Sequence, residues 1–303
     1  MSDFQVLLIA GTHGNEINAP WLFEHSNVEH ELLKIYGLKA LTVIGNPQAR
    51  KLCKRYLDRD LNRSFKKQLL ASEINQDYEV KRAKELISEF GADSLNPCQL
   101  AFDLHTTTAS MGSSLVLYGR RPADLALASL IQAKIGIPIY LHEGDDSQQG
   151  FLVESWPSGL VIEIGPAPQG LLQMSIVKKT KFVLEAAFES LAKIKNSTCN
   201  YPDKLIIHSH QGSLDFPRDL NGHINALVHP LLEGEDWKPL TSGKPLFEGF
   251  DKQLFLYNGE DGCIPVFINE AAYMEKNIAM SLTKRETLKV KKEWKDQLFN
   301  LLS

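Results

Sequence analysis

Short apolar runs alternate with helix-like segments through the first two thirds of this 303-residue chain. Five runs are almost wholly apolar, which is typical of strands covered on both faces: 4–10, 38–45, 100–104, 114–118 and 160–164. Four other segments carry apolar residues at helical spacing: 15–25, 79–90, 122–134 and 171–195. Elements that alternate in this way pack as layers, so we expect an α/β fold with a mixed, mainly parallel sheet flanked by helices.

The texture of the sequence changes near Asn196-Ser197-Thr198. Beyond this point, short strand-like pieces are separated by Gly, Pro, Asn and Asp: 204–209, 224–228, 252–257 and 263–268. Such a pattern is typical of a small β-rich domain. We therefore predict a larger α/β domain, 1–198, and a smaller β-rich C-terminal domain, 199–303.

Composition excludes several classes of protein without selecting one. The 33 basic and 37 acidic side chains leave a net charge of −4, which disfavours a nucleic-acid partner. No apolar run reaches the roughly 18–20 residues of a membrane span, so we expect no membrane partner. The N-terminus lacks the apolar stretch of a signal peptide, and the four cysteines are scattered. These features predict a cytoplasmic protein with reduced thiols.

Polar residues follow two of the predicted strands, at the edge of the sheet where open α/β folds bind ligands. His13 and Glu16 lie just after the first strand, three residues apart, so their side chains can converge on one point. His105 follows the 100–104 strand. Two imidazoles and a carboxylate are the ligand set of a catalytic zinc, which keeps its fourth position for water or substrate. The alternative is a surface histidine and a glutamate that caps a helix.

Glu163 lies near the end of the apolar run 160–164. An unpaired carboxylate is costly to bury, so such a residue usually has a partner or a raised pKa. A structural ion pair would satisfy it. Beside a metal-bound water, its role would instead be that of a general base. The local sequence leaves both roles open.

Residues 50–67 contain eight basic side chains and two acidic ones, Asp58 and Asp60. A nucleic-acid patch would need aromatic residues between the charges, and the segment holds just Tyr56 and Phe65. A solvated face is one alternative. The other is that one or two arginines point inward and bind a carboxylate, which the planar guanidinium does in bidentate fashion.

Several motifs resemble those of the aspartoacylases. Four lie in the first two thirds of the chain: Gly11-Thr12-His13-Gly14-Asn15-Glu16, Asp60-Leu61-Asn62-Arg63, Asp103-Leu104-His105-Thr106-Thr107 and Glu163-Ile164-Gly165-Pro166. Three more lie towards the C-terminus: 229–230, 236–240 and 265–273. Aspartoacylases belong to the succinylglutamate desuccinylase/aspartoacylase family, whose fold is related to that of zinc carboxypeptidases. The resemblance covers nearly the whole chain, in order and at similar spacing.

The resemblance implies one zinc ion per chain, held by His13, Glu16 and His105. It makes Glu163 the general base that takes a proton from zinc-bound water and later delivers it to the leaving amine. It also makes Arg55 the group that polarises the scissile carbonyl of the substrate.

The same resemblance implies a small-molecule substrate, an N-acyl amino acid that is hydrolysed to a carboxylate and a free amino acid. Asn62 and Arg63 would bind its α-carboxylate, and Tyr273 would reach it from the C-terminal domain. Arg55 and Glu163 would contact it as well. Relatives form homodimers, so a homodimer is a further expectation from the resemblance.

One departure from the family's pattern concerns the side chain of the substrate. Aspartate-selective members carry an arginine in the loop before the general-base strand, whereas here no arginine occurs between Arg121 and Arg218. Acidic residues in the loop 142–149 would repel a carboxylate unless Lys276 or another cation reaches it. N-acetyl-L-aspartate is therefore the nominal substrate. The alternatives are neutral or aromatic N-acyl amino acids, or a non-catalytic module that binds a small acid.

Overall fold

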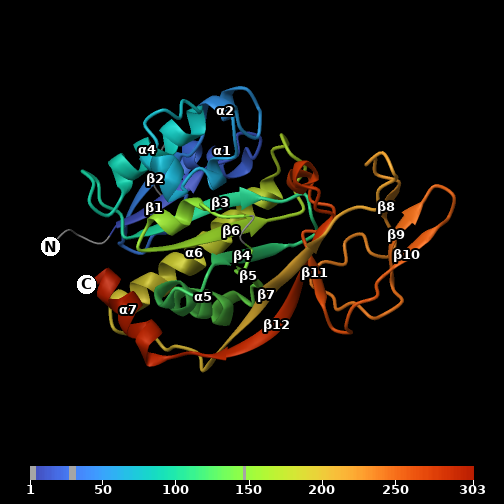
Figure 1. The fold of residues 1–303 in the computed structure, drawn as a ribbon. Coiled ribbons are helices and arrows are strands. Elements are labelled where there is room, and N and C mark those ends of the chain that lie inside the picture. Colours follow the sequence, from blue (N-terminus) through green and yellow to red (C-terminus); the bar gives the residue numbers. More distant parts are fainter. Residues whose placement is uncertain (1–4, 27–31, 146–147) are drawn as a thin grey trace.

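The computed structural model describes residues 5–26, 32–145 and 148–303. Within these ranges, most strands join one nine-stranded sheet (Figure 1). From one edge to the other its strands are β2 (Lys39–Ile44), β1 (Gln5–Ala10), β3 (Leu100–Thr106), β6 (Ser158–Ile164), β4 (Ser113–Tyr118), β5 (Ile139–His142), β7 (Lys204–Leu214), β12 (Met280–Lys289) and β11 (Ile264–Val266). Neighbours from β2 to β6 are parallel, as are β4, β5 and β7, while β4 is antiparallel to β6. The predicted mixed, mainly parallel sheet is confirmed.

Helices cover both faces of this sheet (Figure 1). One face carries α1 (Asn18–Ser26), α5 (Pro122–Ile135), α6 (Met174–Lys195) and α7 (Lys292–Leu302). The other face carries α4 (Tyr78–Phe90) and the turn η2 (Leu152–Ser155). Shorter helical segments lie in the connections: α2 (Pro47–Lys51), η1 (Leu61–Arg63), α3 (Lys67–Ala71) and η3 (Ala271–Lys276). In the part of the chain that the structure describes, no helix has the length and apolarity to cross a membrane.

The pleat of β3 decides which of its side chains face the candidate site. Leu100, Phe102 and Leu104 join the core beneath α5 and α6, whereas Ala101 joins the core beneath α4. Because successive side chains alternate between the two faces of a strand, Asp103 and His105 lie on the α4 side with Ala101. The α4 face of the sheet is therefore the face that carries the polar residues.

Helix α6 begins three residues later than its apolar stripe predicts. The preceding segment is tied to α1 in an extended conformation: Asn18 accepts a hydrogen bond from the Gln173 N–H (2.8 Å) and donates one to the Leu171 carbonyl (2.9 Å). The tertiary contact with α1 overrides the local helical preference here.

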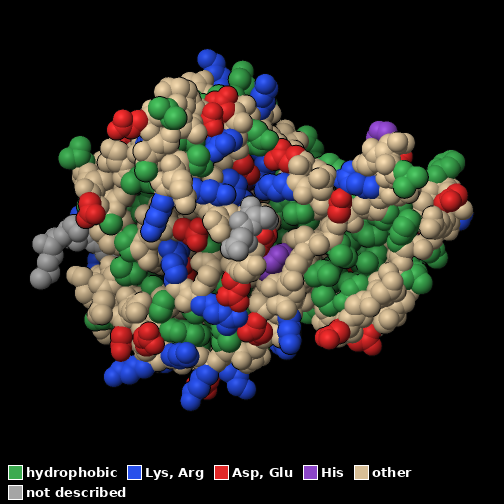
Figure 2. Space-filling view, viewed as in Figure 1, with side chains coloured by type: hydrophobic (Ala, Val, Ile, Leu, Met, Phe, Trp, Pro, Cys, Tyr) green, Lys and Arg blue, Asp and Glu red, His purple; other side chains and the backbone are tan. Residues whose placement is uncertain are grey.

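The C-terminal part contributes to two sheets. Strands β7 and β12 pair antiparallel along ten residue pairs and extend the main sheet. A second sheet, found among the described residues, has three antiparallel strands, β8 (Ala226–Val228), β9 (Pro245–Gly249) and β10 (Leu254–Leu256). It forms the separate β domain at the right of Figure 1, and Figure 2 shows hydrophobic side chains gathered on that domain. The domain boundary predicted between residues 198 and 199 stays a prediction. Strand β7, which follows it in the chain, belongs to the main sheet.

Candidate active site

The three predicted metal ligands lie together at the carboxyl ends of β1 and β3. His13 and Glu16 occupy the loop after β1, and His105 is the penultimate residue of β3. Gly14 lets this loop pack against α2, since a Cβ at this position would lie 2.1 Å from the Ala49 backbone. The ligand atoms of His13, Glu16 and His105 all lie within 4.8 Å of one another, and the three side chains are buried.

Both imidazole rings turn the same nitrogen towards the shared point. Nδ1 of His105 lies 3.1 Å from Nδ1 of His13 and 3.1 Å from Oε2 of Glu16, and Nδ1 of His13 lies 2.6 Å from Oε1 of Glu16. The opposite nitrogens face carboxylates: Nε2 of His13 is 3.0 Å from Asp60, and Nε2 of His105 is 2.7 Å from Asp103. A carboxylate behind each ring holds the proton on Nε2 and leaves the Nδ1 lone pair available for an ion.

This donor set fits a zinc ion. Two nitrogen lone pairs and a carboxylate that face one another in a buried space are mutually repulsive until a cation lies between them. Burial by itself would raise the pKa of Glu16, but its short contacts with the imidazoles of His13 and His105 lower it well below its ordinary value. Glu16 is therefore held as a carboxylate, the form in which it binds metal.

Glu163 faces the same place from the neighbouring strand β6. His105 and Glu163 are register partners on β3 and β6, so both side chains lie on the α4 face. The Oε2 atom of Glu163 is buried and has no hydrogen-bond partner among the described residues. Burial raises the pKa of Glu163 to about 8. A carboxyl with an orphaned oxygen beside a metal-binding group is placed to exchange a proton with a bound molecule.

Arg55 reaches the metal-binding group from the loop after α2. Its guanidinium lies 3.2 Å from Oδ2 of Asp60 and 3.6 Å from Oε1 of Glu16. Burial opposes the charge of Arg55, but Asp60 and Glu16 more than compensate and raise its pKa above the ordinary value. The cation is therefore fixed beside the point on which the three ligands converge.

Asn62 and Arg63 form the turn η1, in which the Asn62 N–H donates to the Asp60 carboxylate (2.9 Å). Arg63 donates hydrogen bonds to the Asn62 carbonyl and to Oε1 of Gln148, both at 2.8 Å, and lies 4.1 Å above the Phe151 ring. These contacts fix the plane of the guanidinium. Of the basic segment 50–67, Arg55 and Arg63 are thus the arginines that point into the site.

The C-terminal part reaches the site through η3. Tyr273 lies on this turn, and burial raises its pKa. Glu270, just before the turn, accepts hydrogen bonds from the Thr107 hydroxyl, from the N–H (2.8 Å) and hydroxyl (3.0 Å) of Thr108, and from the Ala109 N–H (3.2 Å). Glu270 therefore fastens η3 to the loop after β3. The sequence analysis did not single it out, although an acidic residue directly before a helical turn is a typical capping signal.

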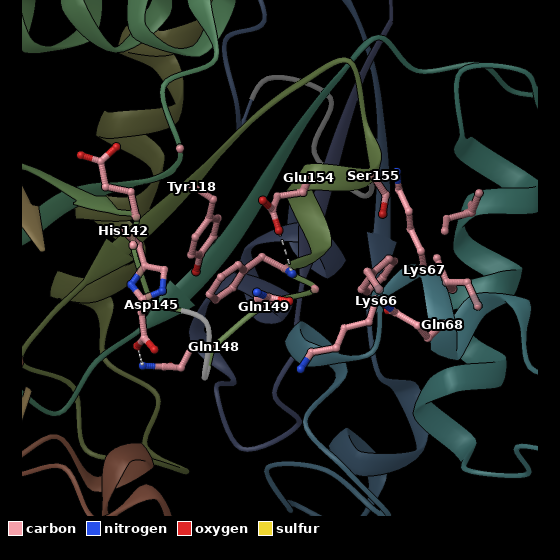
Figure 3. A pocket seen from close by; sticks show the side chains of 18 residues that line it. Lys66, Lys67, Gln68, Tyr118, His142, Asp145, Gln148, Gln149, Glu154 and Ser155 are labelled. Atoms are coloured by element: carbon pink, nitrogen blue, oxygen red, sulfur yellow. Dashed lines mark hydrogen bonds between the residues drawn. The ribbon is translucent and has the colours of Figure 1, made fainter. Parts of the chain in front are cut away.

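One small cavity of about 50 Å³ brings the predicted residues together. Eight of its lining residues are those predicted from the sequence: His13, Glu16, Arg55, Asn62, Arg63, His105, Glu163 and Tyr273. Two larger cavities adjoin it. One, of about 850 Å³, shares Tyr118 with the small cavity and is drawn in Figure 3. The other, of about 780 Å³, shares Arg63 with it.

The loop 142–149 lies along the larger of these cavities. Glu143 and Asp145 line the cavity of about 850 Å³, as the acidic sequence of the loop predicts. Residues 146 and 147 of the loop lie outside the described residues. Lys276 lines the other large cavity, so it does reach the neighbourhood of the site.

Comparison with known proteins supplies the family. The succinylglutamate desuccinylase/aspartoacylase catalytic domain matches residues 2–190, and the AstE/AspA barrel-sandwich hybrid domain matches residues 203–285. The chain belongs to the succinylglutamate desuccinylase/aspartoacylase family. A relative named "Probable aspartoacylase" from Prochlorococcus marinus (strain MIT 9313) is 56% identical over 302 residues, which cover 100% of this chain and 99% of the relative. A relative of the same name from Parasynechococcus marenigrum (strain WH8102) is 49% identical over 305 residues, with 100% of both chains covered.

Solved structures of the family share the fold. Murine aminoacylase 3 superposes with a TM-score of 0.86 and 33% identity, over 95% of this chain and 97% of that one. The succinylglutamate desuccinylase from Chromobacterium violaceum has a TM-score of 0.64 at 19% identity, over 95% and 86% of the two chains, which is a likeness of fold alone. These matches confirm the predicted family and place the chain among hydrolases of the aspartoacylase and aminoacylase type.

Proposed function

We propose that this chain is a zinc-dependent amidohydrolase that deacylates an N-acyl amino acid, nominally N-acetyl-L-aspartate to acetate and L-aspartate. The observation that carries the proposal is the convergence of Nδ1 of His13 and Nδ1 of His105 with the Glu16 carboxylate. Asp60 and Asp103, behind the two rings, support it because they fix the tautomer that binds a metal ion. The names of the relatives agree with this chemistry.

A zinc ion held by His13, Glu16 and His105 would act as a Lewis acid that lowers the pKa of water and polarises a carbonyl. Glu163 takes the proton of the attacking water on Oε2 and later delivers it to the amine nitrogen that leaves. A carboxyl whose pKa is raised towards neutrality suits both steps, because it can accept a proton from water and release that proton to the amine. Arg55 stabilises the negative charge that develops on the carbonyl oxygen.

The substrate is oriented by the residues of η1 and η3. Arg63, with its plane fixed by Gln148 and Phe151, binds the α-carboxylate in bidentate fashion. Asn62 uses its side-chain oxygen to accept from the Leu152 N–H (2.8 Å), which turns its amide NH₂ to the substrate. Tyr273, which also lines the small cavity, contacts the substrate from η3. A substrate held in this orientation places its carbonyl carbon where water attacks it. The reaction then takes place within one complex, which lowers the entropic part of the barrier.

Metal analysis combined with an assay of amine release tests the proposal. The purified protein should contain about one zinc per chain, lose activity on exhaustive chelation and regain it when zinc is returned. Full activity after removal of the metal would contradict the mechanism. Release of no amine from any N-acyl amino acid would favour a non-catalytic binding module instead.

Deacylation of an aromatic N-acyl amino acid is a second candidate. It is favoured by the wall of Phe65, Tyr118 and Phe151 in the cavity of about 850 Å³, which adjoins the small cavity. Comparison of N-acetyl-L-phenylalanine with N-acetyl-L-aspartate as substrates distinguishes the two candidates. The cytoplasmic location and the homodimer stay predictions.

A further inference from the structure

Strand β4 carries a polar residue, Ser114, at a position where a buried strand normally has an apolar one. Ser114 is fully buried, and its Oγ atom has no hydrogen-bond partner among the described residues. The residues that follow it, Leu115 to Leu117, are buried and apolar. A hydroxyl group that is buried without a partner costs free energy, so its presence in a native strand requires a reason.

Ser114 lies directly opposite Glu163 in the antiparallel pair of β4 and β6. The pairing continues beyond these two residues, since the Gly165 N–H donates to the Gly112 carbonyl at 2.7 Å. Directly opposite residues of an antiparallel pair share one face of the sheet, with Cβ atoms about 4.5–5.5 Å apart. Val116, two residues along β4, belongs to the core beneath α4. Ser114 is therefore a neighbour of Glu163 on the face of the sheet that carries the candidate site.

Three polar residues thus form a row across β3, β6 and β4, which lie side by side in the middle of the main sheet (Figure 1). Glu163 is the central member, and its register partners are His105 on one side and Ser114 on the other. His105 belongs to the metal-binding group. Ser114 therefore approaches Glu163 from the side away from the proposed zinc ion, where a hydrogen bond leaves the metal ligands undisturbed.

The unsatisfied atoms of Ser114 and Glu163 are complementary. Oε2 of Glu163 and Oγ of Ser114 are both buried, and neither has a hydrogen-bond partner among the described residues. An ionised carboxylate accepts hydrogen bonds and cannot donate them, whereas a hydroxyl group donates one. A change of rotamer would bring the two groups together, because χ1 of serine has three staggered positions. A carboxylate has about four lone-pair sites, so Oε2 can accept from Ser114 and also take the proton of water.

A general base has to lie within hydrogen-bond reach of the proton that it takes. The glutamate side chain turns about several bonds, and Oε2 of Glu163 has no partner among the described residues to fix it. A hydrogen bond with an ionised acceptor is shorter and about twice as strong as one between neutral groups. Such a bond from Ser114 would fix the carboxylate and leave its approach to the small cavity open, since Glu163 lines this cavity and Ser114 does not.

We infer that Ser114 is a positioning residue for the general base. Its hydroxyl group donates a hydrogen bond to Oε2 of the ionised Glu163 carboxylate and orients it towards the attacking water. This inference rests on the proposed deacylase function and adds a residue to it. Ser114 acts through Glu163 and does not touch the substrate.

Two pairs of variants that differ by one hydroxyl group test the inference. Ser114→Ala removes the hydroxyl from the native residue, and Ser114→Val lacks the hydroxyl of Ser114→Thr at nearly the same shape. We expect the zinc-loaded Ser114→Ala protein to lose about tenfold in kcat for N-acetyl-L-aspartate or N-acetyl-L-phenylalanine, as befits a hydrogen bond to a charged group. Its KM and its zinc affinity should stay within about threefold of the wild-type values. Ser114→Thr should exceed Ser114→Val in kcat by a similar factor.

A double-mutant cycle identifies the residue through which Ser114 acts. In a Glu163→Ala background, Ser114→Ala should change the residual kcat by less than about twofold, because the carboxylate that it orients is gone. Effects of independent residues would multiply instead. Thermal unfolding supplies a second readout. Ser114→Ala should not lower the melting temperature, because the hydroxyl has no described partner to lose.

Ser113→Ala is the matched control. Ser113 precedes Ser114 on β4 and pairs with Ile164, whose side chain belongs to the core beneath α5 and α6. The change removes a hydroxyl group from the same strand on the opposite face. It should leave kcat within about twofold of the wild-type value.

The outcomes separate the inference from the function on which it rests. An active wild-type protein with an unaltered kcat in Ser114→Ala would overturn the inference and leave the deacylase function standing. Equal kcat values for Ser114→Thr and Ser114→Val would overturn the role of the hydroxyl group. A full loss that persists in the Glu163→Ala background would overturn the action through Glu163. Failure of every N-acyl amino acid to react with the wild-type protein would contradict the proposed function, and this inference with it.

Discussion

Asp103 permits a quantitative test of the geometry around the metal-binding group. Its Oδ2 atom lies 2.7 Å from Nε2 of His105, and its Oδ1 atom accepts a hydrogen bond from the Thr12 hydroxyl at 2.6 Å. The side chain is fully buried. Asp103→Asn keeps the shape of this residue and removes its charge, so it tests whether an anion is needed to hold His105 ready for zinc.

The expected loss follows from the contacts of Asp103. Removal of an outer-shell partner of a metal-ligating histidine weakens metal binding about 10–100-fold. The Thr12 hydroxyl can accept as well as donate, so one orientation of the amide keeps both hydrogen bonds and places its oxygen towards His105. The loss then comes mainly from the missing charge, and we expect it near the lower limit, about tenfold or about 1.4 kcal/mol.

Competition with a chromophoric chelator measures the zinc affinity of the apoprotein directly, without reference to turnover. Asp93→Asn makes the same chemical change on the exposed loop after α4 and should leave the affinity unaltered. If the zinc Kd of Asp103→Asn stayed within about threefold of the wild-type value, the carboxylate would not be orienting His105.

Three further predictions follow from the structure. Glu163→Gln should retain zinc and lose about 10²–10⁴ in kcat, and unchanged turnover would assign Glu163 a structural role. Arg63→Ala should lower kcat/KM for N-acetyl-L-aspartate about tenfold or more, and an unaltered kcat/KM would remove Arg63 from the site. Burial raises the pKa of Asp236 from 3.8 to about 6, so its neutral form favours the folded state below about pH 4 and that contribution is lost as the pH rises through about 6. Asp236→Asn should therefore raise the free energy of unfolding by up to about 3 kcal/mol at about pH 8 and by little at about pH 4, whereas an equal effect in denaturant titrations at both would refute the reasoning.

Elements with a strong local pattern could be predicted, and those that depend on distant partners could not. The strands β1, β3 and β6 are almost wholly apolar apart from their site residues, because both of their faces are covered. Strand β12 (Met280–Lys289) contains several charged residues, so no apolar run marks it in the sequence. It is a strand because it pairs with β7. Helix α7 did carry a local signal, since Trp294, Leu298 and Leu302 recur at helical spacing, but the sequence analysis did not use it.

The sequence by itself determined which residue types stand at the ends of the buried strands, because hydrophobic periodicity and motif spacing are local properties. It thereby identified His13, Glu16, His105 and Glu163 as candidates. The tertiary structure alone decided that the register of β3 and β6 sets Glu163 opposite His105, and that both imidazoles turn Nδ1 inward. It also decided which basic residues of 50–67 face the site and that Lys276 joins them. Strand register, ring orientation and the meeting of distant cations are fixed by packing between separate segments, and no local pattern encodes the distance between two such segments.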